Sequence, residues 1–181
     1  TAEQTLYEHV RDVLMGGATC LQLREKHLDE ASFYEEAKNI KELCRLFDVP
    51  FIINDNVMLA KEIDADGVHV GQDDMACAKA REILGPDKII GVSAHTIEEA
   101  RIAKEQGADY LGVGAIFPTS SKDDAEVLGI KRLKEMTDTV DLPMVAIGGI
   151  SYDNCLLLKD TGIDGIAVIS ALFGQKNIKQ A

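Results

Sequence analysis

The chain has 181 residues, of which 46% are hydrophobic and 28% charged, and its formal net charge at pH 7 is −12. These totals are typical of a globular protein with a sizeable core, and we expect residues 1–181 to form one domain. The negative charge argues against nucleic acid and against anionic membrane surfaces as partners. The sequence shows no membrane-spanning run, no signal peptide and no CxxC pair, so we expect a cytoplasmic protein.

Apolar strands and amphipathic helices alternate along the whole chain. The hydrophobic periodicity predicts helices over 1–15, 29–47, 56–63, 74–84, 96–106, 126–138 and 152–161, and a short helix from 171. It predicts strands over 18–23, 50–54, 67–71, 88–93, 110–116, 143–148 and 165–170. A weak repeat supports this alternation, because a small residue, often with Asp, precedes the strands in GGATCLQL, ADGVHVG, GADYLGVG and GIDGIAV.

Strict alternation with short connections predicts an α/β fold with a parallel sheet covered by helices. An open doubly wound sheet is the alternative, but its GxGxxG fingerprint is absent after the first strand. Polar residues follow nearly every strand, which is where a (β/α)₈ TIM barrel builds its site. We therefore expect a TIM barrel that lacks its first strand, since seven strands are visible and an eighth would lie upstream of Thr1.

Two acids follow neighbouring strands, Asp55 after the second and Asp74 after the third. Oxygen ligands supplied from separate elements suit a hard cation that keeps positions for water and a substrate phosphate. The alternative is that each acid caps the helix that follows it. Asn54 and His69 lie beside them and strengthen the case for a metal site, and both interpretations stay open.

Cationic and amide side chains follow the first strand. By alternation Gln22 and Arg24 share one face of that strand, and Lys26 follows at the rim, so Arg24 and Lys26 are anion-binding candidates. The alternative for Arg24 is a buried structural pair with Glu25.

Three further groups suit phosphate. The loop PTSSKDD offers hydroxyls and an ammonium, unless it is simply a solvated loop. Gly148-Gly149, and Ile169-Ser170 after the last strand, offer backbone N–H groups where barrels often bind phosphate, although glycine is also required by turns. Ser93 ends another strand, and His95 follows two residues later. His95 has two possible roles: a general acid or base, or a polar residue that leads into the next helix. His69 is expected on an interior face, either touching a ligand or satisfied in the core.

Two acids, several cations, hydroxyls and a glycine-rich cradle, without an activated nucleophile, suit a magnesium-assisted reaction with a pyrophosphate leaving group and a second, phosphorylated substrate.

These motifs, in this order, resemble those of the thiamine phosphate synthase family. The matching stretches are QLREK at 22–26, IND at 53–55, DGVHVGQDD at 66–74, GVSAHT at 91–96, ADYLGVGAIFPTSSKDDA at 108–125, VAIGGI at 145–150 and DGIAVIS at 164–170. The resemblance covers almost the whole chain and implies a (β/α)₈ barrel. Position 121 departs from the family, with Ser where Thr is usual, and keeps the hydroxyl.

The resemblance implies that 4-amino-2-methyl-5-hydroxymethylpyrimidine diphosphate is joined to a (carboxy)thiazole phosphate through a dissociative, carbocation-like step, giving thiamine phosphate and pyrophosphate. It places Mg²⁺ on Asp55 and Asp74, and it implies small-molecule substrates and allows a homo-oligomer. The residues expected to act in catalysis are Arg24, Lys26, Ser93 and Lys122.

The expected substrate contacts divide by ligand. Gln22 would meet the pyrimidine, with Leu23, Glu25 and His69 also assigned to substrate binding. The diphosphate would be held by Arg24, Lys26, Asn54, Ser93 and Lys122. The thiazole would be contacted by Thr119, Ser120 and Ser121, and its phosphate by Gly149, Ile169 and Ser170.

Two rival functions remain at this point. A thiazole tautomerase would share the barrel and the phosphate cradle and would need a proton shuttle such as His95, but not the metal and diphosphate site. A non-catalytic thiamine phosphate binding barrel would have less need of two acids.

Overall fold

The computed structural model describes residues 5–119 and 127–175. Its strands are β1 (Leu21–Leu23), β2 (Phe51–Asn54), β3 (Gly67–Val70), β4 (Ile89–Ala94), β5 (Tyr110–Val113), β6 (Met144–Ile147) and β7 (Gly165–Ala167). Its helices are α1 (Leu6–Met15), α2 (Glu30–Leu46), α3 (Val57–Glu62), α4 (Cys77–Leu84), α5 (Ile97–Glu105), α6 (Gly129–Thr139) and α7 (Ser170–Phe173), with one 3₁₀ turn, η1 (Cys155–Leu158).

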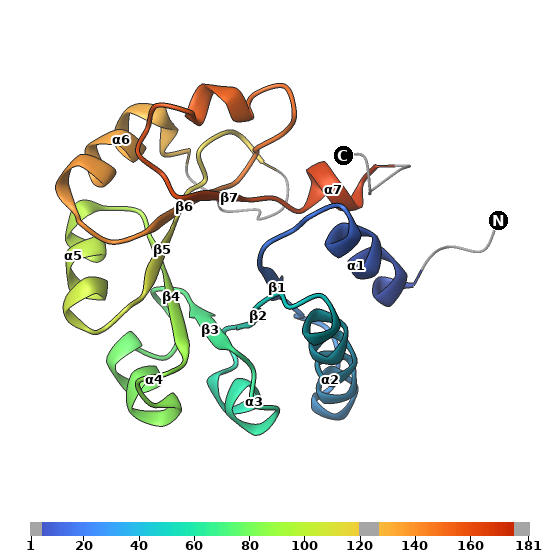
Figure 1. The fold of residues 1–181 in the computed structure, drawn as a ribbon. Coiled ribbons are helices and arrows are strands. Elements are labelled where there is room, and N and C mark those ends of the chain that lie inside the picture. The colour runs from blue at the N-terminus through green and yellow to red at the C-terminus, as the bar shows by residue number, and fades with distance from the viewer. Residues whose placement is uncertain (1–4, 120–126, 176–181) are drawn as a thin grey trace.

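The strands form one parallel sheet in the order of the sequence, β1 to β7. The sheet is curled, and helices α2 to α6 lie along its convex outer side (Figure 1). Among the described residues β1 and β7 are the two edges, so the sheet is an open, curled half-barrel and not a closed barrel of eight strands. The predicted α/β class, the parallel pairing and the seven strands are confirmed.

The core lies between the outer face of the sheet and the helices. Every second residue of the strands packs there, including Leu21, Ile53, Val68, Ile90 and Leu111, each at most 7% exposed. Since side chains alternate across a strand, the residues between them face the hollow of the sheet, where the predicted site residues lie.

The repeated aspartates have a structural role just before the N-terminal ends of the strands. Each one donates its backbone N–H to the carbonyl of the first or second residue of the preceding strand. The same carboxylate accepts the N–H of that residue. These pairs of hydrogen bonds connect Asp66 to Phe51, Asp109 to Ile90 and Asp164 to Met144. The distances from the backbone nitrogen to the carboxylate oxygen are 2.8, 2.7 and 2.9 Å.

Most predicted elements are confirmed, and several have different limits. The helix predicted from 74 begins at Cys77, after a turn, and the helix predicted over 152–161 is wrong, because only the short turn η1 forms there. Asn154 explains this second difference: its side chain accepts the N–H of Ser151 and donates to the carbonyl of Gly149, which fixes a turn where the helix would begin. The strand predicted over 165–170 ends at Ala167.

Helix α1 begins at a capping box, in which Thr5 and Glu8 each bind the other's backbone N–H. It lies beside α7 near the open side of the sheet (Figure 1), where the rings of His9 and Phe173 meet edge to face at 6.2 Å. Within the described ranges, none of the helices is both long and apolar enough to cross a bilayer.

Candidate active site

The predicted polar residues gather on the inner face of the curled sheet. The register pairs Asn54 with His69, His69 with Gly91, and Ser93 with Gly112. Because neighbouring residues in register point to the same face, one face is shared by several polar side chains from β1 to β5. These side chains are Gln22, Asn54, His69, Ser93 and Tyr110.

Neither of the two acids caps a helix. The cap of α3 is Asn56, whose side chain accepts the N–H of Leu59, and the residue before α4 is Ala76, which offers no side-chain bond. Asp55 adopts a φ of 62°, a left-handed conformation in which Asp is better tolerated than most residues. The helix-cap alternative is therefore wrong, and both carboxylates are available for another role.

Lys26 reaches from the loop after β1 to Asp55 at the end of β2. Its Nζ lies 2.5 Å from Oδ2 of Asp55, and the two side chains are 44% and 26% exposed. Burial acts to raise the pKa of Asp55, but the hydrogen bond from Lys26 and the nearby positive charges hold that pKa below its usual value. Asp55 is thus ionised and already paired with a cation at the rim of the sheet.

Asp74 shares this environment with Asp55. Its pKa is raised, first by desolvation and then by its interaction with the Asp55 carboxylate, although a hydrogen bond from the N–H of Gly71 at 2.7 Å acts in the opposite direction. Because each carboxylate shifts the pKa of the other, the two lie close together. A cation between them would relieve the repulsion of their negative charges.

A buried histidine on β3, His69, connects its own strand with β4 and β5. His69 is 8% exposed, and its Nδ1 and Nε2 lie 2.9 Å from the Tyr110 hydroxyl and the Ser93 hydroxyl respectively. Desolvation lowers the pKa of His69 to about 4, and burial raises the pKa of Tyr110. Both groups are therefore neutral at physiological pH. His69 is satisfied by hydrogen bonds, and it also holds a hydroxyl that was predicted to meet a ligand.

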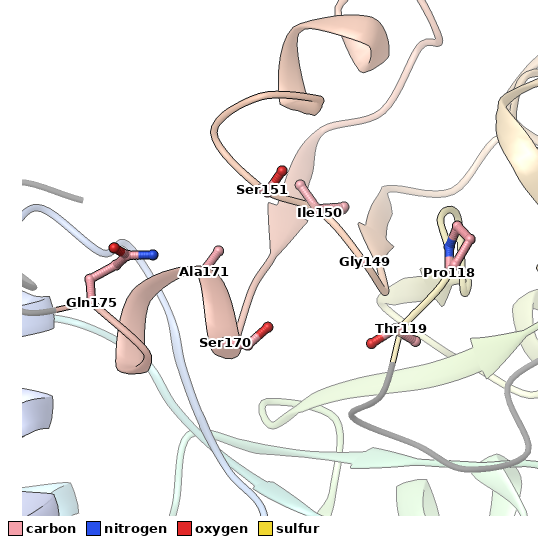
Figure 2. A pocket seen from close by; sticks show the side chains of 8 residues that line it. All are labelled: Pro118, Thr119, Gly149, Ile150, Ser151, Ser170, Ala171 and Gln175. Atoms are coloured by element: carbon pink, nitrogen blue, oxygen red, sulfur yellow. The ribbon is translucent and has the colours of Figure 1, made fainter.

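A separate pocket lies at the ends of β5, β6 and β7. Its volume is about 330 Å³, and Figure 2 shows the hydroxyls of Thr119 and Ser170 pointing toward the space between them, with Gly149 beside it. Of the described residues that line it, none has a charged side chain. The lining residues are Pro118, Thr119, Gly149, Ile150, Ser151, Ser170, Ala171 and Gln175.

The remaining predicted residues divide between the inner face, the core and the loops. Gln22 and Arg24 are exposed, whereas Leu23 is 7% exposed in the core, where its side chain cannot reach a ligand in the hollow of the sheet. Glu25 forms no ion pair with Arg24; its carboxylate accepts the N–H groups of the next three residues and shapes that loop. Ile169 precedes α7 and is 52% exposed, outside the pocket lining. Ser120, Ser121 and Lys122 lie outside the described residues.

His95 leads into α5. Its backbone N–H donates to Glu99 at 2.7 Å, and its ring Nδ1 lies 3.3 Å from the same carboxylate. The ring is thus held at the start of the helix, in agreement with the second of the two roles expected for it.

Sequence reasoning missed residues that support the site. Tyr110 faces inward because it alternates with buried Leu111, and this signal was available in the strand pattern. Gln72 donates its Nε2 to the carbonyl of Ser93 at 2.6 Å, and Asn154 fixes the turn that follows Gly149. Neither of these contacts leaves a periodic signal, because both come from loops.

The two regions offer different chemistry. The ends of β1 to β3 supply carboxylates and cations, which suit a metal ion and a highly charged anion. The ends of β5 to β7 supply hydroxyls and backbone groups, which suit a phosphate held by hydrogen bonds.

Comparisons with known proteins agree on one family. The family model described as thiamine monophosphate synthase matches residues 1–172. A thiamine-phosphate synthase of Clostridium tetani is 51% identical over 172 residues, which are 95% of this chain and 82% of that protein. The corresponding figures for a thiamine-phosphate synthase of Methanobrevibacter smithii are 49% over 179 residues, 99% and 86%.

Solved structures give the same result. A thiamine phosphate pyrophosphorylase from Pyrococcus furiosus is 44% identical and superposes with a TM-score of 0.92 over 98% of this chain and 86% of that one. FabK from Thermotoga maritima is 17% identical, with a TM-score of 0.76 over 98% of this chain and 58% of its own, and this likeness concerns the fold alone.

Proposed function

This chain belongs to the thiamine monophosphate synthase family, a family of transferases, and from that premise we propose the reaction that its site performs. The chain joins 4-amino-2-methyl-5-hydroxymethylpyrimidine diphosphate to a thiazole phosphate. The products are thiamine phosphate and pyrophosphate. The curled parallel sheet, with its site at the carboxyl ends of the strands, supports a fold of the (β/α)₈ barrel type.

The region around Asp55 is proposed to hold the diphosphate. Lys26 and exposed Arg24 supply positive charge at the end of β1, in a molecule whose net charge of −12 would otherwise repel an anion. Asn54 and Ser93 add neutral hydrogen-bonding groups on the same face. These residues would bind the diphosphate and neutralise it as it leaves.

The donor set fits Mg²⁺, because two carboxylates from different strand ends disturb each other's pKa and magnesium prefers oxygen ligands. Asp55 and Asp74 would hold the ion. When bound, it would supply positive charge to the leaving diphosphate.

The neutral pocket is proposed to bind the phosphate of the thiazole substrate. The hydroxyls of Thr119 and Ser170 and the backbone beside Gly149 surround it (Figure 2), and hydrogen-bond donors of this kind bind phosphate without a charged side chain. Ser120, Ser121 and Lys122 follow Thr119 in the sequence and lie outside the described residues; we assign Ser120 and Ser121 to the thiazole and Lys122 to the diphosphate as part of the proposal.

The reaction needs electrostatic stabilisation and positioning more than a nucleophile. An aminopyrimidine can stabilise positive charge on its exocyclic carbon once the C–O bond to the diphosphate breaks. The thiazole nitrogen then attacks that carbon. The protein therefore has to stabilise the departing anion and hold the second substrate in line.

The observation that carries this proposal is that one rim holds two regions of different chemistry, a charged region with the acid pair Asp55 and Asp74 and a separate pocket lined by hydroxyls. A tautomerase would need neither the acid pair nor a second anion site, and the ring of His95 is tied to Glu99. A non-catalytic binding barrel would have little use for two close carboxylates.

A coupling assay tests the proposal. The purified chain is incubated with both substrates and Mg²⁺, and thiamine phosphate is measured by chromatography, with an EDTA-treated sample as control. We expect product that depends on the metal and on both substrates. A folded chain that binds both substrates and forms no product would refute the synthase and favour the binding barrel.

A further inference from the structure

The hydroxyl of Ser93 on β4 is held by a chain of hydrogen bonds that begins on the neighbouring strand β5 and passes through β3. Tyr110 on β5 contacts Nδ1 of His69 on β3, and Nε2 of His69 contacts Oγ of Ser93 on β4, each at 2.9 Å. The rings of His69 and Tyr110 lie 5.4 Å apart between their centroids. The three groups thus form one continuous path on the inner face of the sheet.

The direction of the first bond decides the direction of the second. Within residues 5–119 and 127–175, His69 Nδ1 is the hydrogen-bond partner of the Tyr110 hydroxyl. If Nδ1 carried a proton and donated it, the O–H of the half-buried Tyr110 would be left without an acceptor among these residues, which is unfavourable. Tyr110 therefore donates to Nδ1.

A neutral imidazole that accepts at Nδ1 carries its proton at Nε2. This N–H donates to Oγ of Ser93. The Ser93 oxygen then uses a lone pair for the histidine, and its own O–H is left to donate elsewhere. The network thus sets Ser93 as a donor, which is the polarity that a phosphate oxygen requires.

The sheet provides space for this path. A Cβ at Gly112 would lie 2.8 Å from Cε1 of His69, and a Cβ at Gly91 would collide with the ring of Tyr110. The backbone of Ser93 is fixed as well, because Gln72 donates to its carbonyl at 2.6 Å. The position of Ser93 is therefore fixed by both its side chain and its backbone.

We propose that Tyr110 and His69 are positioning residues that act through Ser93, fixing its hydroxyl as a hydrogen-bond donor toward the diphosphate. The inference rests on the proposed function, since the diphosphate is the ligand assigned to that face. Tyr110 itself need not touch the substrate.

The first test is the tautomer of His69, measured by ¹⁵N NMR on the ligand-free protein, with the signals assigned by a His69→Gln variant. We expect a neutral ring protonated at Nε2. A ring protonated at Nδ1 would overturn the proposed direction of the path, whether or not the protein is active.

The second test is a double-mutant cycle with Tyr110→Phe and Ser93→Ala, measured as kcat and as the Kd for pyrophosphate in the presence of Mg²⁺. We expect Tyr110→Phe to weaken pyrophosphate binding by about 5- to 10-fold, the value of one hydrogen bond. In the Ser93→Ala background the same change should have less than about a twofold effect. Tyr7→Phe, on the exposed side of α1, is the matched control and should leave both constants unchanged.

The outcomes separate this inference from the proposed function. Equal losses from Tyr110→Phe in both backgrounds would mean a purely structural role and would overturn the relay. If the parent chain forms no thiamine phosphate while the tautomer and the pyrophosphate cycle are as expected, the synthase proposal fails and the relay stands.

Discussion

At the scale of single residues, Asp55 is the side chain on which most of the charged region depends. It forms an ion pair with Lys26, raises the pKa of Asp74 and occupies a left-handed backbone conformation. Asn tolerates that conformation as well, so Asp55→Asn removes the charge and leaves the turn intact. We expect this change to lower kcat/KM for the coupling reaction by at least about 100-fold, because charge stabilisation in the transition state is lost.

Asp48→Asn is the matched control, since Asp48 has a φ of 56° in an exposed turn before β2. Its activity should equal that of the parent chain. Equal activity of both variants would contradict the role of Asp55.

His69 gives a prediction about pH and stability. Its pKa is lowered from 6.5 to about 4, mainly by desolvation, with a smaller opposing effect of Asp55. Between these values the unfolded chain binds a proton that the folded chain does not. The free energy of unfolding therefore falls as the pH falls from 6.5 to 4, by at most about 1.4 kcal/mol per pH unit from this residue.

Denaturant unfolding of the parent chain and of His69→Gln across this range measures the effect. The variant should show a shallower dependence on pH. Parallel curves would mean that His69 is protonated in the folded protein.

At the scale of elements, the paired bonds made by the aspartates before the strands hold neighbouring strands in register. Asp109 bonds the N–H of Ile90 and also contacts Arg81 at 2.6 Å. We expect Asp109→Ala to lower the free energy of unfolding by about 1–3 kcal/mol, because the backbone N–H of Ile90 loses its acceptor and Arg81 keeps only its carbonyl partners. Asp141→Ala serves as control, since Asp141 is fully exposed and 3.9 Å from Lys104. Equal stability of the two variants would contradict this role.

The sequence predicted most elements because the apolar pattern changes its period at nearly every boundary. It failed over 152–161, where a helix was predicted and only the turn η1 forms, with Leu156 and Leu157 80% and 61% exposed. Local side-chain bonds from Asn154 decided that segment, and such bonds carry no period.

The site was predictable where a polar residue interrupts an apolar strand, as at His69, or directly follows one, as at Asp55. The hydrogen-bond or ion-pair partner of each residue was not predictable. Lys26 meets Asp55 across 29 positions and His69 meets Tyr110 across 41, and only the register of the folded sheet brings these pairs together. Leu23 differs from these residues: it was assigned to the ligand as part of a motif, and alternation turns its side chain into the core.

At the scale of the whole molecule, the sheet has two edges among the described residues. Central strands pair on both sides, whereas β1 and β7 pair on one side only. We expect hydrogen exchange of the amides in β3 to β5 to be at least about tenfold slower than in β1 and β7, since edge strands open more readily. Uniform protection would mean that the edges are covered in solution, for example by a second copy of the chain.

The separation of a charged region from an uncharged pocket has a consequence for ionic strength. Added salt screens the attraction between Lys26 and an anion, but it also screens the repulsion from a molecule with net charge −12. Screening of the attraction dominates beside the cations, and screening of the repulsion dominates beside the neutral pocket. Raising the salt concentration should therefore increase the KM for the pyrimidine diphosphate and leave the KM for the thiazole phosphate unchanged or lower. Steady-state kinetics over a salt series would measure both, and parallel increases would show that the two substrates experience the same electric field.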